Sequence, residues 1–472
     1  MLDSGATQIL ILGGTGDLSR RKLLPALLDL YARGMLPEVF HIIGLARSKW
    51  GRHEYSTFVK ESIDKYHLGH THTAQQVNDF CSHISFVSGS FDDFSSYDRL
   101  QSSLDEFDVK RGVRSNRLFY LAVPPKHYSQ IFNDLKKSGV ADESEKKWTH
   151  ILVEKPFGNN LQTAQELDSQ LAKLYREDQI FRIDHYLAKE AVQNILSFRF
   201  ANTLLKAPWD KDSVQSVYIK MTETIDVGGR SGFYEGVGAL RDVGQNHLLQ
   251  LLALVAMKEP DTFTVEAIRD ARTEVLESLR PVTKETLNDS VIRAQYDGYK
   301  SDEAIPNDSE TETYFELKTF VDSPTWKDVP FFIQAGKALE VGEVSITINF
   351  KDVATGLFET KTCFSIGNQI KLTISPEQEI AITLNAKSPD LGYQLETRTL
   401  SYKCKEGENK IKNSYEKVLY DSIVGDQTLF TKTEEVHAAW KFITPILETW
   451  NKLPLHTYKK GSAGPVETLL KM

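Results

Sequence analysis

The strongest constraint on the fold is the alternation of short apolar runs with helical patterns in the first third of the chain. The run Gln8–Leu12 ends at Gly13, and a helical pattern follows over Ser19–Arg33. Further strand-like runs are His41–Leu45, Ile84–Val87, Leu118–Val123 and His150–Val153. Strands that alternate with helices predict a parallel sheet covered by helices on both faces. We therefore expect a doubly wound, Rossmann-like α/β domain over residues 1–180, ending after the helical pattern Ala164–Arg176.

The last third of the chain follows a different period. Apolar residues alternate with polar ones in three stretches, at Val344–Phe350, Ile370–Ile374 and Ile380–Leu384. This alternation is typical of strands that bury one face, as in an antiparallel sheet. A chain of 472 residues has room for two domains. We expect the second, over residues 181–472, to be an α+β domain with a large, mainly antiparallel sheet and helices, and Asp297–Glu312 to be a surface loop.

Composition excludes several classes of protein. Apolar residues make up 40% of the chain, too many for a disordered protein, and no apolar run approaches the roughly 20 residues that cross a bilayer. The net charge of −9 disfavours a nucleic-acid binder, and the N-terminus does not resemble a signal peptide. Cys81, Cys363 and Cys404 are far apart, which predicts neither a disulfide framework nor structural zinc and favours the reducing cytoplasm.

The turn between the first strand and the first helix reads Gly13-Gly14-Thr15-Gly16-Asp17-Leu18. Glycines there let backbone amides approach a pyrophosphate, and the helix N-terminus adds partial positive charge. Ser19 stands where a third glycine is usual. The turn predicts a dinucleotide site, the alternative being a plain turn. Arg47 follows the second strand and no acid occurs between residues 41 and 50, which favours NADP over NAD unless Arg47 is only a surface residue.

A second group of polar residues lies near the proposed domain boundary. If a helix begins at Arg182–Glu190, then His185, Tyr186 and Lys189 share one face. An imidazole, a phenol and an ammonium can hold a phosphate monoester through charge-assisted hydrogen bonds. The alternative is a solvated helix face with Tyr186 half buried.

Three further residues are candidates for the chemistry. His247 lies on the apolar face of a helical pattern that begins at Arg241 and could act as a general base, with Asp184 orienting it. The alternatives are a hydrogen-bonded core histidine and a helix N-cap, respectively. Lys155 follows a strand at the edge where parallel sheets bind ligands, and could contact both cofactor and substrate, or could be a surface lysine.

Taken together, these segments resemble the glucose-6-phosphate dehydrogenase family over nearly the whole chain. The segments that carry the resemblance are Gly13–Leu18, Leu36–Glu38, Ala46–Ser48, Leu118–Pro125 (LFYLAVPP), Glu154–Gly158 (EKPFG), Arg182–Glu190 (RIDHYLAKE), Phe198–Asn202, Arg241–Gln250 (RDVGQNHLLQ), Gly336–Leu339, Glu434–Trp440 and Gly461–Pro465.

The resemblance implies oxidation of glucose 6-phosphate at C1 with NADP, giving 6-phosphogluconolactone and NADPH, the first step of the oxidative pentose phosphate pathway. It implies that His247 is the base and Asp184 its partner. The other implied roles are a phosphate grip (His185, Tyr186, Lys189), contacts to sugar hydroxyls (Glu223, Asp242, Lys337), a bridge from substrate to coenzyme (Lys155, with a cis bond before Pro156) and contacts to the 2′-phosphate (Thr15, Arg47). No metal is expected in the reaction, and a homodimer is implied.

Two departures from the family pattern qualify these expectations. The family often has a second basic residue shortly after the Gly-Lys-Ala-Leu segment, but this chain has Glu340-Val341-Gly342-Glu343 there. A substrate contact is therefore expected to be lost or supplied elsewhere. The sequence ends at Met472, before the tail that binds a second NADP in longer members, so no second NADP is expected. The rival hypotheses are another sugar or sugar-phosphate dehydrogenase and a non-catalytic dinucleotide-binding regulator.

Overall fold

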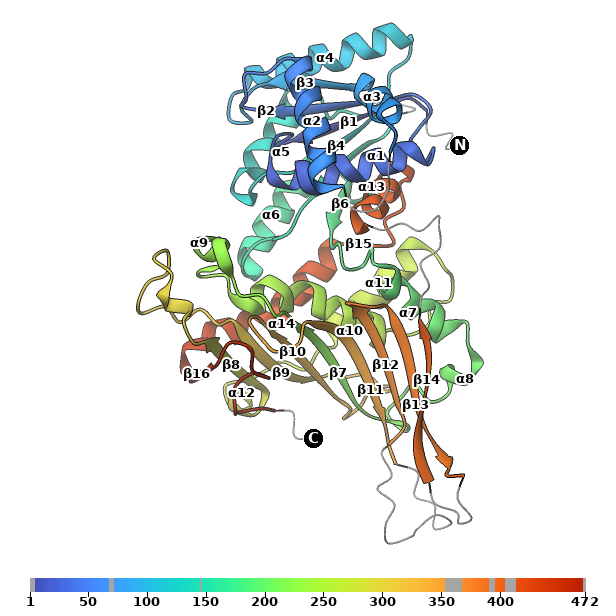
Figure 1. Cartoon of the computed structure of the whole chain (residues 1–472), viewed down its shortest axis with the longest axis vertical. Helices are drawn as coiled ribbons and strands as arrows, with labels where there is room; N and C mark the ends of the chain where they lie inside the picture. The colour runs from blue at the N-terminus through green and yellow to red at the C-terminus, as the bar shows by residue number, and fades with distance from the viewer. Residues whose placement is uncertain are drawn as a thin grey trace. The chain divides into compact units, whose positions relative to one another are not determined.

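The structure is a computed structural model that describes residues 5–67, 72–144, 147–352, 367–389, 395–403 and 413–469. Cys363 and Cys404 lie outside these ranges, and Cys81 is buried with a free thiol. The chain divides into two compact units (Figure 1). Unit 1 comprises Met1–Ala188, Thr264–Glu266 and Asn409–Thr433, and unit 2 the remainder. Within the described ranges, no helix is both long enough and apolar enough to span a membrane.

Unit 1 is built on a seven-stranded sheet in the order β15-β6-β5-β4-β1-β2-β3. Its strands are β1 (Thr7–Leu12), β2 (Phe40–Ala46), β3 (Ile84–Ser88), β4 (Asn116–Leu121), β5 (Thr149–Val153), β6 (Ile180–Ile183) and β15 (Phe430–Thr431). All neighbours are parallel except β15, which pairs antiparallel with β6. The central strands β1, β4 and β5 are buried at every position, as expected when both faces of a parallel sheet are covered.

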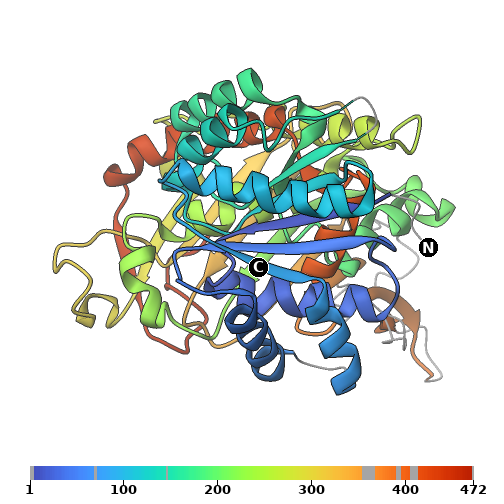
Figure 2. The same ribbon diagram turned by 90° about the horizontal axis from the view of Figure 1, so that it is seen from above.

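Helices cover both faces of this sheet (Figure 2). The helices of unit 1 are η1 (Ser19–Leu23), α1 (Leu24–Ala32), α2 (Arg52–Tyr66), α3 (Ala74–Ser82), α4 (Ser95–Arg111), η2 (Pro125–His127), α5 (Tyr128–Lys137), α6 (Leu161–Leu174), η3 (Glu177–Gln179) and α13 (Ser414–Val424). Helix α1 packs against α2, α3 and α13, and their apolar side chains share one core with β1, β2 and β4.

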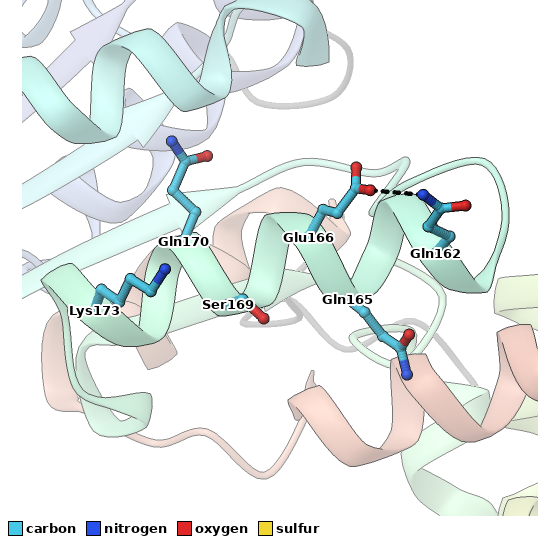
Figure 3. Close-up of a pocket in the computed structure, with 6 residues that line it drawn as sticks. All are labelled: Gln162, Gln165, Glu166, Ser169, Gln170 and Lys173. Carbon is cyan, nitrogen blue, oxygen red and sulfur yellow. Dashed lines mark hydrogen bonds between the residues drawn. The ribbon is translucent and has the colours of Figure 1, made fainter.

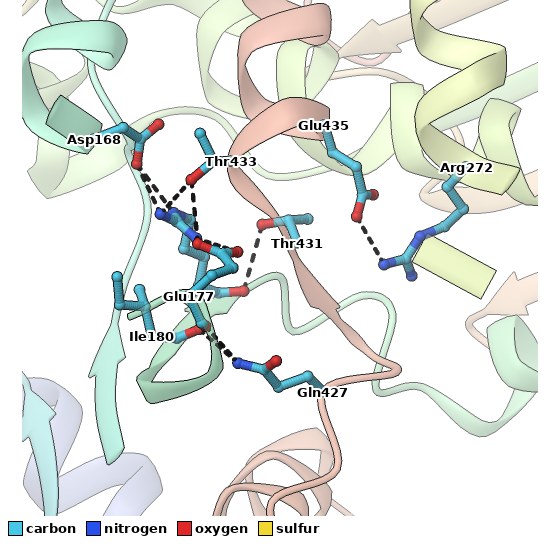
Figure 4. A network of polar contacts seen from close by, with 9 residues as sticks. Asp168, Glu177, Ile180, Arg272, Gln427, Thr431, Thr433 and Glu435 are labelled. Carbon is cyan, nitrogen blue, oxygen red and sulfur yellow. Dashed lines mark hydrogen bonds and ion pairs between the residues drawn. The ribbon is translucent and has the colours of Figure 1, made fainter. Parts of the chain in front are cut away.

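Two elements of unit 1, α13 and β15, come from late in the chain. Val418, Leu419 and Ile423 of α13 are at most 3% exposed and belong to the same core as Leu27 of α1. A buried arginine also ties the late segment to the early one, since Arg182 contacts residues before and after it in the sequence (Figure 4). Its guanidinium donates to Asp168 Oδ1 at 2.8 Å, to both carboxylate oxygens of Glu177 at 2.9 Å and to Thr433 Oγ1 at 2.7 Å.

Unit 2 is built on a nine-stranded, mainly antiparallel sheet in the order β14-β13-β12-β11-β7-β10-β9-β8-β16. Its strands are β7 (Val214–Thr222), β8 (Val291–Tyr296), β9 (Tyr314–Phe320), β10 (Pro330–Gly336), β11 (Glu343–Phe350), β12 (Gln369–Ser375), β13 (Glu379–Lys387), β14 (Leu395–Lys403) and β16 (Leu455–Tyr458). The pairs β7–β10 and β8–β16 are parallel. The parallel pairing of β7 and β10 brings their carboxyl ends together in the middle of this sheet.

Unit 2 also contains helices. They are α7 (Glu190–Phe200), α8 (Thr203–Lys206), η4 (Gly228–Arg230), α9 (Ser231–Tyr234), η5 (Leu240–Leu248), α10 (Leu249–Ala256), α11 (Val265–Glu277), α12 (Leu287–Ser290), η6 (Tyr299–Ser301), α14 (Thr433–Thr449) and η7 (Trp450–Lys452). Helix η5 packs on β7 and β10, and α7 packs on β12. Buried Ile219 and Ile346 alternate along their strands with half-buried Tyr218 and Thr347, so the opposite face is more open.

The predicted fold class is confirmed, and the predicted strands lie where the sequence placed them to within three residues in both sheets. The segment Asp297–Glu312 is largely irregular, but it is not wholly a surface loop. Ile305, Ser309 and Glu312 are buried, because they pack beneath the elements that lead to η5.

Candidate active site

The glycine turn in unit 1 is held at the carboxyl end of β1. Gly13 N–H and Gly14 N–H both donate to Leu45 O at the end of β2, at 2.9 and 3.1 Å. Gly13 has φ +90°, and a Cβ there would lie 2.3 Å from Ala122 O. Only glycine therefore fits this close approach of the turn to the end of β4.

Ser19 replaces the third glycine of the usual pattern without opening the turn. Its side chain is completely buried, and its hydroxyl donates to Gly13 O at 2.8 Å. Thr15 and Gly16 are half-buried and Asp17 is exposed, so the outer side of the turn is open to a ligand. The helix that follows begins as a π-helix at Ser19, one turn earlier than α1 itself.

Two other predicted cofactor residues lie at the same edge of the sheet. Strands β1 and β2 run parallel in register, Leu12 beside Leu45, so exposed Arg47 follows β2 close to the turn that follows β1. Lys155 follows β5 and is half-buried, and the Lys155–Pro156 bond is cis, which confirms the expectation for that bond. These residues suit a dinucleotide because the turn offers backbone amides and Arg47 offers a fork for a phosphate.

Glu154, beside Lys155, is half-buried, and the sequence interpretation overlooked its carboxyl group. Tyr120 Oη donates to Glu154 Oε1 at 2.5 Å, and Tyr128 Oη donates to the Glu154 backbone oxygen at 2.9 Å. Burial raises the pKa of Glu154 to about 6, and the negative charge of Asp184 adds to the rise. Asp184 follows β6, the neighbour of β5, so both carboxylates lie at the carboxyl edge of the unit 1 sheet.

The prediction that a helix begins at Arg182–Glu190 is wrong. Strand β6 runs to Ile183, residues 184–189 form turns, and α7 begins only at Glu190. The Asp184 side chain accepts a hydrogen bond from Tyr186 N–H at 3.0 Å, and Leu187 N–H donates to Asp184 O at 3.1 Å. These local bonds give the backbone an alternative to a helix. His185, Tyr186 and Lys189 are therefore presented by a turn and not by one helix face.

His247 lies in η5, which is helical as predicted but is a π-helix up to Leu248. Such π-helical stretches are frequent at functional sites. The His247 residue is 1% exposed, and its backbone N–H donates to Asn246 Oδ1 at 2.6 Å. Gly244 lets η5 approach the sheet, because a Cβ there would lie 2.8 Å from the ring of Phe315 on β9.

The structure of unit 2 brings Glu223 and Lys337 together. Glu223 follows β7 and Lys337 follows β10, and the Lys337 ammonium donates to the Glu223 carboxylate. Lys337 Nζ also lies 5.5 Å from the ring centre of Tyr234, a favourable cation–π distance. Burial raises the pKa of Tyr234 well above its usual value, and the negative charge of Asp242 contributes. The three residues that the resemblance assigned to sugar hydroxyls are therefore all near Tyr234.

A second overlooked group, Glu312, holds the start of the helix that carries Asp242 and His247. Its Oε1 accepts from Leu240 N–H at 3.0 Å, and its Oε2 accepts from Trp450 Nε1–H at 3.3 Å. Burial raises the pKa of Glu312 to about 7. Glu312 lies at the end of an acidic stretch, so the sequence pattern did not indicate that it is buried.

Two surface features of the chain lack the groups expected of the site. Glu340–Glu343 connects β10 to β11 without a basic residue, and Glu343 pairs with Lys371 at 2.5 Å. A polar hollow along α6 (Figure 3) contains none of the predicted site residues. Its lining comes from one helix face, where Gln162 Nε2 donates to Glu166 Oε1 at 2.9 Å, so we interpret it as a solvated surface.

The doubly wound sheet, its glycine turn and the basic residue after β2 define a class, the dinucleotide-dependent dehydrogenases. Family models place this chain more narrowly. The NAD binding domain of glucose-6-phosphate dehydrogenase matches residues 10–194, and the C-terminal domain of glucose-6-phosphate dehydrogenase matches residues 196–471. The chain therefore belongs to the glucose-6-phosphate dehydrogenase family.

Individual relatives agree with this assignment. The chain is 37% identical to a cytoplasmic glucose-6-phosphate 1-dehydrogenase of Arabidopsis thaliana, covering 98% of this chain and 90% of the relative. It is 35% identical to glucose-6-phosphate 1-dehydrogenase of Chlamydia pneumoniae, covering 97% and 93%. Among solved structures, a glucose-6-phosphate dehydrogenase in complex with glucose 6-phosphate is 36% identical, with a TM-score of 0.88 over 98% of this chain and 95% of that chain.

Proposed function

We propose that this chain oxidises D-glucose 6-phosphate at C1 to 6-phospho-D-glucono-1,5-lactone, passing the hydride to NADP, as the first step of the oxidative pentose phosphate pathway. The observation that carries the proposal is the match of the whole chain to a solved relative bound to glucose 6-phosphate. The charged residues at the ends of β7 and β10 support it, because a sugar needs several polar groups that are held in fixed positions.

The oxidation requires a base for the C1 hydroxyl proton. We assign this role to His247, because an imidazole is the side chain best suited to accept a proton near neutral pH. Asp184 would hold the imidazole in the correct orientation and stabilise the imidazolium that forms. General base catalysis of this kind contributes about 10²–10⁴ to the rate.

The two ends of the substrate would be held by different groups. His185, Tyr186 and Lys189 would bind the phosphate, a source of binding energy remote from the reacting carbon. Glu223, Asp242 and Lys337 would bind the sugar hydroxyls. The pairing of Lys337 with Glu223 keeps the ammonium in place before substrate arrives, which lowers the cost of ordering it.

The coenzyme accepts the hydride when it is bound to the first domain, for which we propose residues 1–180. The residues assigned to it are Gly13, Thr15, Gly16, Asp17, Leu18, Arg47 and Lys155. The positive φ of Gly13 and the open outer side of the turn support this assignment. A preference for NADP rests on Arg47, which is exposed after β2 with no acid nearby in the sequence.

A spectrophotometric assay tests this function directly. The purified chain is mixed with NADP and, in separate reactions, with glucose 6-phosphate, other hexose 6-phosphates and free glucose, and reduced nicotinamide is followed. His247→Asn is expected to lower kcat at least about 100-fold with KM nearly unchanged, whereas His53→Asn, at an exposed position on α2, retains activity. Absence of turnover with every hexose 6-phosphate would exclude the proposed function, and a fully active His247→Asn variant would exclude the base.

We also propose that two copies associate through the open face of the unit 2 sheet, in the cytoplasm. Tyr218 and Phe332 stack there at 4.8 Å and line a hollow with polar side chains of β11 and β12. An aromatic surface with polar neighbours is typical of protein interfaces. Light scattering on the purified chain should give twice the mass of 53.5 kDa, and a monomer at micromolar concentration would exclude this dimer. The cytoplasmic location follows the Arabidopsis relative's name.

A further inference from the structure

A compact group of side chains with metal-ligating atoms lies in unit 1 and shares no residue with the proposed catalytic set. It consists of Asp29 on α1, His67 at the end of α2 and His72 just before α3. The Nε2 atoms of His67 and His72 lie 2.9 and 3.0 Å from Asp29 Oδ1, and 3.3 Å from each other. Three potential ligand atoms, from α1, the end of α2 and the residue before the α3 N-cap, therefore converge on one point.

All three side chains are at least nine-tenths buried. The exposed fractions are 7% for His67, 9% for His72 and 9% for Asp29. A buried carboxylate is costly unless cations or donors surround it. The nearest arginine along α1, Arg33, pairs with Glu416 at 3.0 Å, so the two imidazoles are the groups that face Asp29 in the described structure.

The distances among the three atoms suit a tetrahedral metal ion. Zinc binds imidazole nitrogen at about 2.0–2.1 Å and carboxylate oxygen at about 2.0–2.2 Å, which places tetrahedral ligand atoms about 3.3 Å apart. The distances of 2.9, 3.0 and 3.3 Å lie within a few tenths of an ångström of that value. Magnesium and calcium prefer oxygen ligands, so two imidazoles favour zinc or another late first-row divalent ion.

We propose that Asp29, His67 and His72 form a zinc site that holds the end of α2 and the start of α3 to α1. Among the described residues three protein ligands are present, and the fourth position would be filled by water. The role is structural, because α1 follows the glycine turn and the ion would restrain the far end of that helix. The proposal departs from the prediction of no structural zinc, which was based on the three separated cysteines; this group uses carboxylate and imidazole donors instead.

Zinc titration of the whole chain, after removal of metals with a chelator, tests the proposal. Isothermal titration with zinc chloride should show one site per chain, and zinc should raise the Tm because it binds the folded state. Replacing zinc with Co²⁺ should give the intense visible absorption of tetrahedral cobalt, and a weak octahedral spectrum would contradict the geometry.

Matched variants locate the ion. Asp29→Asn, which preserves the shape of the side chain, His72→Gln and His67→Ala should each weaken zinc binding at least about 100-fold, since even indirect partners of a metal cost about 10–100-fold. His53→Ala, at an exposed position on α2, should bind zinc as the unmodified chain does. Circular dichroism confirms that the variants fold. Absence of zinc binding by the unmodified chain, or equal affinity in the three ligand variants, would overturn the proposal.

Discussion

The buried carboxyl group of Glu312 should make the stability of the protein depend on pH in a defined direction. Its pKa of about 7 in the folded protein exceeds the ordinary value of 4.5. Between these values the folded state binds more protons than the unfolded state, so the free energy of unfolding falls as pH rises. One pKa unit corresponds to about 1.4 kcal/mol, so the loss between pH 4.5 and pH 7 is about 3 kcal/mol.

The substitution Glu312→Gln removes this dependence. The amide oxygen can still accept from Leu240 N–H, but the amide nitrogen cannot accept from Trp450 Nε1–H, which costs about 1 kcal/mol. Above pH 7 the variant should therefore be about 2 kcal/mol more stable than the unmodified protein, and near pH 4.5 about 1 kcal/mol less stable.

Urea denaturation at several pH values between 5 and 8 measures the difference. Glu→Gln at exposed Glu303 serves as the control, because it removes the same charge without altering a buried group. A difference between Glu312→Gln and the unmodified protein that stays constant across this pH range would refute the reasoning. If the Glu312→Gln variant also retains activity, the amide still holds the start of η5 in place.

Three further substitutions should have separable effects. Arg272→Ala removes the guanidinium that lies 3.0 Å from the buried Glu435 carboxylate (Figure 4). It should lower the free energy of unfolding by about 3–5 kcal/mol in urea denaturation, and an unchanged midpoint would contradict this expectation. Lys189→Ala should weaken the binding of glucose 6-phosphate at least about 10-fold and that of free glucose little, and Lys258→Ala at an exposed position serves as the control. Unchanged discrimination between the two sugars would contradict the role of Lys189 in binding the phosphate. Arg47→Ala should raise the KM for NADP at least about 10-fold more than the KM for NAD, whereas the control Lys49→Ala should not. An equal effect on both coenzymes would contradict a contact of Arg47 with the 2′-phosphate.

Local sequence patterns predict much of this fold because the positions that a strand or helix buries recur at regular intervals along the sequence. Strands such as β1 and β4 are covered on both faces and appear as continuous apolar runs, and β11 is covered on one face and alternates. The pairing of β6 with β15 has no such signal, since β15 has two residues and lies about 250 positions away. Pairing over that distance depends on the whole assembled unit.

The candidate site was only partly predictable for similar reasons. The spacing in Asp184–Lys189 fits a helix, but a single side-chain hydrogen bond to Tyr186 N–H makes a turn there. Glu312 carries no pattern that distinguishes a buried carboxylate from an exposed one. Asp29 lies 38 residues before His67, so folding alone brings their atoms together.

Unit 1 contains segments from early and late in the chain, which has a consequence for its folding during synthesis on the ribosome. Strand β6 ends at Ile183, but its neighbour β15 begins only at Phe430. At about 5–20 residues per second, the nascent chain waits roughly 12–50 s for these last pieces. During that interval the unpaired edge of β6 and the apolar surface that α13 later covers are exposed. Both can bind chaperones or cause aggregation. A fragment ending near residue 188 should therefore be poorly soluble, and joining it to residues 409–433 should rescue it.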